Sequence, residues 1–140
     1  MTWTYNGNVI DELPDNVVGF VYCITNLTND RKYIGKKLAK RSKTKTVKDK
    51  KKKIKVSSDW KTYYGSSDEL VDDVKKLGND KFYREILRLC YSLTECTYYE
   101  AKEQFVRGVL ESDDYYNAWI MARCRKSNLK SKNNDNNKNS

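Results

Sequence analysis

The chain has 140 residues, a length that favours a single domain with one modest core. It contains no histidine, which excludes a Ser-His-Asp triad, an imidazole general base and a histidine-ligated zinc ion. Its 28 lysine and arginine residues outnumber its 19 acidic residues, and the net charge of +9 favours a polyanionic partner.

The positive charge is concentrated in one internal segment. Residues 36–55 contain eleven lysines and Arg41 against a single acid, Asp49. Phosphate contacts made by such side chains release counterions and give a salt-sensitive, sequence-independent affinity. A solvated basic loop is the alternative explanation. An anionic membrane surface fits less well, because the segment has almost no apolar face.

The cysteine pattern and the hydropathy indicate a reducing compartment. The four cysteines include no Cys-x-x-Cys pair, which disfavours a zinc knuckle and suits buried thiols. The first residues lack the pattern of an export signal, and no stretch approaches the roughly 18 apolar residues of a membrane span. We therefore expect a cytoplasmic protein with no membrane partner.

The first predicted elements form a β-hairpin. β-branched and aromatic residues fill 19–25 and predict a buried strand. Asparagine and aspartate over 26–30 predict a turn, and a second short strand follows over 31–36. A short helix near 37–42 and a long lysine-rich loop over 36–58 come next in the prediction.

A helix and a third strand follow the basic segment. Ser66 and Glu69 have the spacing of a capping box, and the apolar pattern predicts a helix over 68–77 that ends before Gly78. Alternating residues then predict a strand over 82–90.

A second, longer helix is expected from a cap at Thr94 to about Leu110. Its predicted apolar face consists of Tyr98, Ala101, Phe105 and Val109. Residues 115–122 are expected to pack back on the body.

Together these elements predict an α+β fold with a small three-stranded antiparallel sheet flanked by helices. We expect residues 1–18 to form an N-terminal segment and residues 19–125 to form the domain. The composition of residues 126–140, mostly asparagine, lysine and serine, predicts a disordered basic tail.

Several residues could form a chemical site. Tyr22 and Tyr33 lie eleven residues apart on the two strands of the hairpin, which can bring them together. Gly35 leaves room for a phosphate backbone, and Lys36 follows it. Glu100 lies near the start of the second helix. Taken singly, strand tyrosines usually pack in a core, and a glutamate early in a helix usually serves the helix dipole.

Taken together, these positions resemble the GIY-YIG nuclease family over residues 19–120. Val21-Tyr22 and Tyr33-Ile34-Gly35 are similar to the two halves of the family signature. The likeness is greatest to small phage-encoded, homing-type endonucleases, which share Tyr-Ile-Gly-Lys-Lys and the motifs found here at 59–67, 100–102 and 113–117.

The resemblance implies roles for individual residues. It assigns catalysis to Tyr22, Tyr33, Glu100 and Asn117, with Glu100 also holding Mg²⁺ or Mn²⁺. One tyrosine would accept a proton from the attacking water, which requires a nearby cation to lower its pKa. Asn117 would position Glu100 or a substrate oxygen.

Two departures from the family pattern stand out. Phe20 takes the place of the first glycine, with Gly19 one residue earlier. The family arginine would fall at Lys43, so we assign its role to Arg41, with Lys36 as the alternative. The residues expected to bind nucleic acid are Gly35, Lys36, Lys37, Lys40, Lys43 and Trp60, although Trp60 could instead pack in the core.

The implied function is a metal-dependent DNA endonuclease that hydrolyses phosphodiester bonds, of a phage homing or mobile-element type. Its partner would be double-stranded DNA in the host cell cytoplasm, bound by a monomer or a homodimer. Two alternatives remain open: a catalytically inactive nucleic-acid-binding protein on the same fold, and a basic accessory protein that binds RNA or a host protein.

Overall fold

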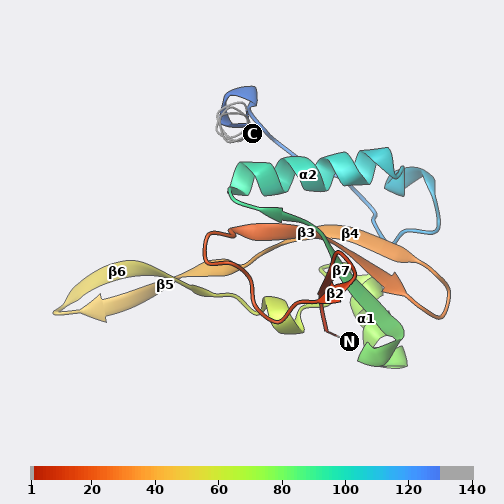
Figure 1. Ribbon diagram of the computed structural model, residues 1–140, viewed down its shortest axis with the longest axis horizontal. Coiled ribbons are helices and arrows are strands. Elements are labelled where there is room, and N and C mark those ends of the chain that lie inside the picture. The colour runs from red at the N-terminus through yellow and green to blue at the C-terminus, as the bar shows by residue number, and fades with distance from the viewer. Residues whose placement is uncertain (1, 130–140) are drawn as a thin grey trace.

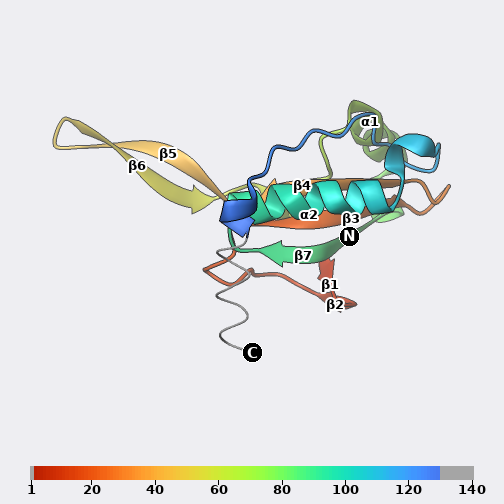
Figure 2. The ribbon, with the colours of Figure 1, turned by 90° about the horizontal axis from the view of Figure 1, so that it is seen from above.

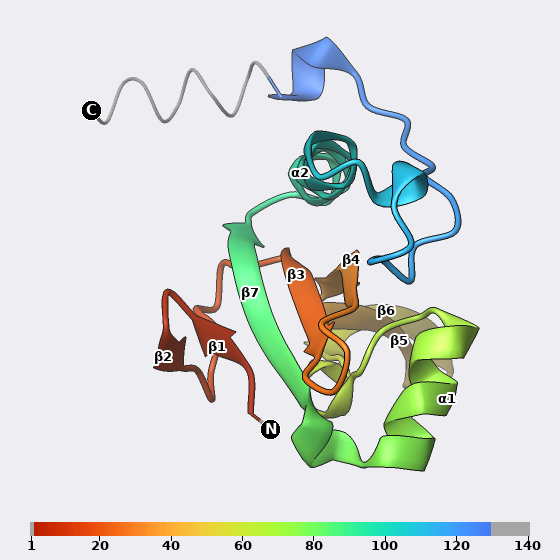
Figure 3. The same ribbon diagram turned by 90° about the vertical axis from the view of Figure 1, so that its right-hand side faces the viewer.

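Three antiparallel strands organise the structure, a computed structural model that describes residues 2–129. The central strand, β3 (Gly19–Asn26), pairs with β4 (Lys32–Leu38) on one side and with β7 (Phe82–Cys90) on the other. All eight residues of β3 are buried, because the sheet is covered on both faces (Figure 3). The predicted hairpin and the predicted third strand are therefore confirmed.

The sheet has five strands rather than the three predicted. The two additional strands, β1 (Thr4–Tyr5) and β2 (Asn8–Val9), lie in the N-terminal segment, and β1 runs parallel to β7. Strands of two residues carry no detectable periodicity, so the sequence could not reveal them. The same segment supplies Trp3, which is 1% exposed and lies in the core.

The lysine-rich segment is a β-ribbon and not the predicted loop. β5 (Lys40–Val47) and β6 (Lys50–Ser57) pair along their whole length as a separate two-stranded sheet. This ribbon projects from the body of the protein (Figures 1 and 2). The helix predicted near 37–42 does not form, because β4 continues to Leu38 and β5 begins two residues later.

A tight turn explains the ribbon. Lys48 and Asp49 have φ angles of 50° and 62°, the pair of left-handed residues that defines a type I′ hairpin turn. Lysine followed by aspartate is a poor sequence signal for this turn, which usually contains asparagine and glycine. β5 itself alternates threonine with lysine, and threonine favours extended backbone.

Helix α1 (Asp68–Leu77) has the predicted bounds but a different cap. Ser67, and not Ser66, occupies the N-cap, and its hydroxyl accepts a hydrogen bond from the Leu70 N–H at 3.4 Å. Gly78 follows the helix with φ 94°, a conformation that glycine adopts without strain. Leu70 and Val74 are buried against the face of the sheet that carries Phe20 and Ile24.

Helix α2 (Leu93–Val106) covers the opposite face of the sheet, with Ser92 rather than Thr94 as its N-cap (Figures 1 and 3). Its predicted apolar face is right for Ala101 and Val109, which are buried, and wrong for Phe105 and Tyr98, which are 68% and 38% exposed. The helix also ends at Val106 and not near Leu110, so Val109 belongs to the 3₁₀ helix that follows, η3 (Val109–Glu111). The buried residues of the helix are Glu95, Cys96, Ala101 and Gln104. Small and polar residues face the sheet because some of them hydrogen-bond its edge strand.

Three short 3₁₀ helices complete the order of elements: η1 (Trp60–Thr62), η2 (Asn79–Lys81) and η3 (Val109–Glu111). After η3 the chain returns alongside β4, where Tyr115 forms a parallel bridge with Lys32. Of the predicted tail, residues 126–129 form a helical turn and residues 130–140 lie outside the described part. In the described part of the chain, no helix is long and apolar enough to cross a membrane.

The cap of α1 can be tested with two neighbouring serines. Ser67→Ala should lower the free energy of unfolding by about 1 kcal/mol, because the Leu70 N–H loses its acceptor. Ser66→Ala should cost less, since its hydroxyl bonds a tyrosine side chain instead. Urea denaturation of both variants measures the difference, and an equal or larger loss at Ser66 would contradict the assignment.

Candidate active site

Gly35 creates the space around which the site is built. It lies opposite Tyr22 in the β3–β4 pairing, and the ring of Tyr22 extends over it. A Cβ atom at residue 35 would lie 2.7 Å from Cζ of Tyr22 and 3.0 Å from a ring carbon of Tyr33. The space left by this glycine is therefore filled by the two tyrosines, and not left open for a phosphate backbone as expected.

Three tyrosines gather on this face of the sheet. The ring of Tyr22 lies 6.1 Å from that of Tyr33 and 5.8 Å from that of Tyr63, centroid to centroid. The Tyr22 hydroxyl donates to the Tyr63 hydroxyl at 3.5 Å, and the Tyr33 hydroxyl pairs with Ser66 at 2.8 Å. The expected meeting of Tyr22 and Tyr33 is thus observed, and Tyr63 joins them from the segment after η1.

The surroundings of Tyr22 disfavour its ionised form. The side chain is fully buried, and burial is the largest cause that raises the pKa of Tyr22 well above 10.0. Tyr63, Tyr33 and Glu100 raise it further. Burial also raises the pKa of Tyr33, although its bond to Ser66 opposes the shift. The expectation that nearby cations lower the tyrosine pKa is therefore wrong for the free protein.

Glu100 of α2 approaches the edge of β4 next to Gly35, where it bonds the Lys36 backbone. Burial raises the pKa of the Glu100 carboxyl, while the charge of Lys36 and a hydrogen bond from the Lys36 backbone lower it. The ammonium group of Lys36 donates to Oγ1 of Thr97, one turn before Glu100 on α2, at 2.6 Å. The negative charge of Glu100 also raises the pKa of both tyrosines, which indicates that the carboxyl lies near their hydroxyls at the edge of β4.

Asn117 lies on the same edge but holds the backbone. Its side-chain oxygen accepts from the Ile34 N–H at 3.0 Å, and its amide nitrogen donates to the Ile34 carbonyl at 2.8 Å. Gln104 of α2 donates to the same carbonyl at 3.0 Å. The structure thus places Asn117 as a bidentate cap of β4, two residues from the backbone that Glu100 caps.

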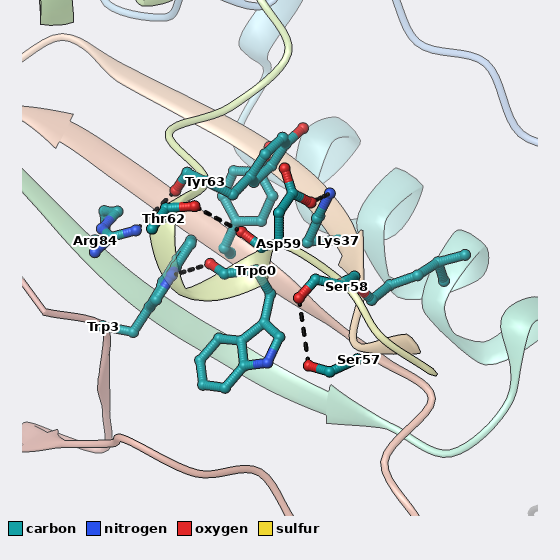
Figure 4. A network of polar contacts seen from close by, with 11 residues as sticks. Trp3, Lys37, Ser57, Ser58, Asp59, Trp60, Thr62, Tyr63 and Arg84 are labelled. Carbon is teal, nitrogen blue, oxygen red and sulfur yellow. Dashed lines mark hydrogen bonds and ion pairs between the residues drawn. The ribbon is translucent and has the colours of Figure 1, made fainter. Parts of the chain in front are cut away.

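Lys37 is the cation beside the tyrosine cluster. Its ammonium group lies 4.2 Å from the centroid of the Tyr63 ring and forms an ion pair with Asp59 at 2.6 Å (Figure 4). The charge of Lys37 lowers the pKa of Asp59, and Arg41 adds a smaller effect. Neither Tyr63 nor Asp59 was predicted as a site residue, although both belong to the 59–67 motif.

A buried arginine holds this segment in place. Arg84 of β7 is 4% exposed and donates to the backbone carbonyls of Lys61 and Tyr63, at 3.0 and 2.8 Å (Figure 4). Trp3 donates its indole N–H to the Trp60 carbonyl at 2.7 Å. These three bonds fix the chain around η1, so that the Tyr63 side chain remains against Tyr22.

The remaining predicted contacts lie apart from the cluster. Arg41, Lys40 and Lys43 are exposed residues of β5, and Arg41 pairs with Val56 at the base of the ribbon. Trp60 is 4% exposed and packs against Phe20, with ring centroids 6.0 Å apart. The Trp60 ring is therefore part of the core, which supports the packing alternative over a contact with nucleic acid.

The donor set suits a cation that keeps most of its water. Within residues 2–129, no three histidine, cysteine or acidic side chains lie together as a metal site. Mg²⁺ at phosphoryl-transfer sites is often held by one or two carboxylates together with water and substrate oxygens. The single carboxyl of Glu100, half buried and bonded to the Lys36 backbone at the strand edge, fits that chemistry.

Comparison with known protein families identifies a similar domain. The family described as "Putative endonuclease segE, GIY-YIG domain" matches residues 3–120. No curated protein and no solved structure matches the chain. The matched range includes the tyrosine cluster, Glu100 and Asn117, and it begins within the N-terminal segment that adds two strands to the sheet.

Tyr22→Phe should reduce the loss of stability at alkaline pH. The folded protein keeps Tyr22 neutral, whereas in the unfolded chain it releases its proton near pH ~10. Its contribution is therefore complete below that pH and disappears as the pH rises further. Urea denaturation between about pH 8 and pH 11 should show a shallower decline for Tyr22→Phe than for wild type, while Tyr91→Phe, at an exposed position, should keep the wild-type decline.

Proposed function

The chain belongs to the GIY-YIG endonuclease family, and from that premise we propose that it is a metal-dependent endonuclease that hydrolyses phosphodiester bonds of double-stranded DNA. The observation that carries the proposal is that Tyr22 and Tyr33 meet at Gly35 of an edge strand while Glu100 bonds the backbone of the next residue, Lys36. Phosphodiester hydrolysis requires an oriented water, neutralisation of charge on the phosphate, and support of the leaving oxygen. The residues at this edge can supply each of these.

Glu100 is the residue proposed to hold Mg²⁺ or Mn²⁺. When bound, such a cation neutralises charge on the phosphate and on the leaving oxygen. Lys36 lies next to the carboxyl and favours its ionised form, which is the form that binds a cation. The Lys36 backbone bond fixes the direction in which the carboxyl points.

Tyr22 is proposed to orient the attacking water through its hydroxyl. A tyrosine of ordinary pKa is already protonated at neutral pH, and the raised pKa of Tyr22 makes its ionisation harder still in the free protein. To accept a proton it needs added positive charge at the site. Lys37, over the adjoining Tyr63 ring, can supply that charge when a phosphate displaces Asp59 as its partner.

Lys37 is therefore our candidate for the role of the family arginine, in preference to Arg41. Lys37 lies on β4, two residues after Gly35 on the same face of the strand, whereas Arg41 lies on the ribbon. A lysine is a compact charge without the planar fork of arginine, so it clamps one phosphate oxygen rather than two.

The chemistry leaves a second candidate function, a catalytically inactive nucleic-acid-binding protein on the same fold. The raised pKa of Tyr22 and the lysine in place of arginine favour it. A phage homing or mobile-element role is a further proposal, consistent with the family description. One site cuts one strand, so double-strand cleavage would proceed through a homodimer on DNA or through two successive nicks.

Plasmid cleavage separates the two functions. Wild type should nick or linearise supercoiled plasmid with Mg²⁺ and not with a chelator, and Glu100→Ala should lose about 10²-fold or more of the rate while still binding DNA. Glu103→Ala is the matched control, because that glutamate lies on the same helix but pairs with Arg107. Salt-sensitive binding without cleavage by wild type, on host, phage and modified DNA alike, would favour the inactive binding protein.

Two substitutions test whether Lys37 or Arg41 fills the role of the family arginine. Lys37→Gln should lower the cleavage rate by about 10²-fold at saturating DNA, because the phosphate loses a charged donor. Arg41→Gln should mainly weaken DNA binding and leave the saturated rate within a few fold. Single-turnover cleavage measures both. The reverse order would return the family role to Arg41, and Lys37→Arg should restore more activity than Lys37→Gln.

A further inference from the structure

The entire net charge of the chain lies on the β5–β6 ribbon. Residues 40–57 contain nine lysines and Arg41 against one acid, Asp49, so the ribbon carries +9. The whole chain also carries +9, and the remaining residues are therefore neutral in sum. A neutral body with one strongly positive arm concentrates its attraction for a polyanion at that arm.

The charges of the ribbon are exposed and have no acidic partner. Every residue of β5 is exposed, and so is every residue of β6 except Val56. Over residues 2–129, none of the ten cations forms an ion pair; Lys40 donates to the Asp15 carbonyl, and Lys55 donates to Ser42. An arm whose cations form no ion pair in the described part of the chain is suited to a phosphate backbone.

The two faces of the ribbon differ in chemistry. The register places Ser42 opposite Lys55, Thr44 opposite Lys53 and Thr46 opposite Lys51, all on one face, which we call the hydroxyl face. The other face pairs Arg41 with Val56, Lys43 with Ile54, Lys45 with Lys52 and Val47 with Lys50. The hydroxyl face thus has a row of three donor–acceptor groups beside a row of three ammonium groups.

The dimensions of the ribbon fit the major groove of B-form DNA. That groove is about 12 Å wide and admits a two-stranded β-ribbon, whereas the minor groove, about 6 Å wide, would have to be widened by bending the duplex to admit one. Successive side chains on one face of a strand lie about 6.8 Å apart, close to two base-pair steps. Hydroxyl groups can bond any base edge, the threonine methyl can contact the thymine methyl, and lysine can donate to guanine.

The base of the ribbon is fixed to the edge of the candidate site. The Ser58 N–H donates to the Ala39 carbonyl at 2.9 Å, and the Ser58 hydroxyl donates to the Leu38 carbonyl at 2.6 Å. Asp59, the partner of Lys37, follows directly. A duplex held by the ribbon would therefore have its register set relative to Lys37 and the tyrosine cluster.

We propose that the β5–β6 ribbon enters the major groove of duplex DNA with its hydroxyl face toward the base edges, while the lysines along its sides contact phosphates. The proposal rests on the proposed function, because it assumes duplex DNA as the substrate. To the proposed function it adds how the protein would select a particular DNA sequence. The ribbon determines which sequence is bound, and the edge of β4 performs the chemistry.

Methylation protection identifies the groove. Full-length Glu100→Ala protein is bound without divalent cation to a duplex that wild type selects from a random pool, and the complex is treated with dimethyl sulfate, which modifies guanine N7 in the major groove and adenine N3 in the minor groove. The proposal requires protection at guanine N7 over several consecutive base pairs with adenine N3 still reactive. Protection at adenine N3 alone, or binding with no N7 protection, overturns it.

The same binding series separates this proposal from the proposed function. Failure to bind duplex DNA contradicts the proposed function itself. Equal binding to a duplex RNA, whose deep major groove excludes a ribbon, contradicts the placement of the ribbon. Binding to duplex DNA without N7 protection contradicts only the placement of the ribbon.

Matched variants test which face of the ribbon contacts the base edges. A triple variant, Ser42→Ala with Thr44→Val and Thr46→Val, keeps the charge and the strand-forming residues but removes three hydroxyls. It should reduce the preference for the selected duplex over a random one by about 10-fold or more and leave the salt dependence unchanged. The control, Lys45→Gln with Lys52→Gln on the other face, should weaken both duplexes equally and lower the salt slope by about two. An unchanged preference in the triple variant would overturn the assignment of the hydroxyl face.

Discussion

The backbone of one edge strand determines how the site is assembled. β4 pairs with β3 on one side only, so the groups that point the other way must find partners, and an unpaired buried group costs about 1–3 kcal/mol. Residues 114–116 bond Lys32, the side chains of Asn117 and Gln104 bond Ile34, Glu100 bonds Lys36, and Ser58 bonds Leu38. These hydrogen-bonding groups, which we call the caps of β4, belong to α2, to the C-terminal segment and to the base of the ribbon.

The same caps bring the candidate catalytic groups together. Glu100 bonds the strand one residue from Gly35, and the missing side chain at Gly35 lets the Tyr22 ring reach that point from the opposite face. The consequence is a conflict between packing and chemistry. Burial makes the position of Tyr22 well defined, but it also raises the pKa that a proton acceptor would need to have lowered. Positive charge at the site is the physical means of resolving it.

The projecting ribbon keeps most of the positive charge of the chain away from the candidate site. A +9 ribbon placed against the sheet would repel Lys36 and Lys37 and disturb the tyrosine cluster, whereas a projecting ribbon exposes its cations to water (Figure 2). The body then holds its own cations in specific pairs, such as Lys37 with Asp59 and Arg31 with Glu69. The protein thus has an ordered site with few charges and an arm with many.

Elements with a local pattern could be predicted from the sequence: periodicity and turn residues indicate the β3–β4 hairpin, α1 and β7, and the ordered motifs indicate the family. The sequence could not determine β1, β2 or the ribbon turn, because two-residue strands and a Lys-Asp turn carry no distinctive pattern. Part of the predicted apolar face of α2 was also wrong, because Glu100 and Gln104 turn toward β4 and hydrogen-bond its backbone, which is far away in the sequence. The position of Lys37 beside the tyrosines and the direction in which the pKa values of Tyr22 and Tyr33 shift could not be predicted, because both depend on groups that come together only in the folded chain.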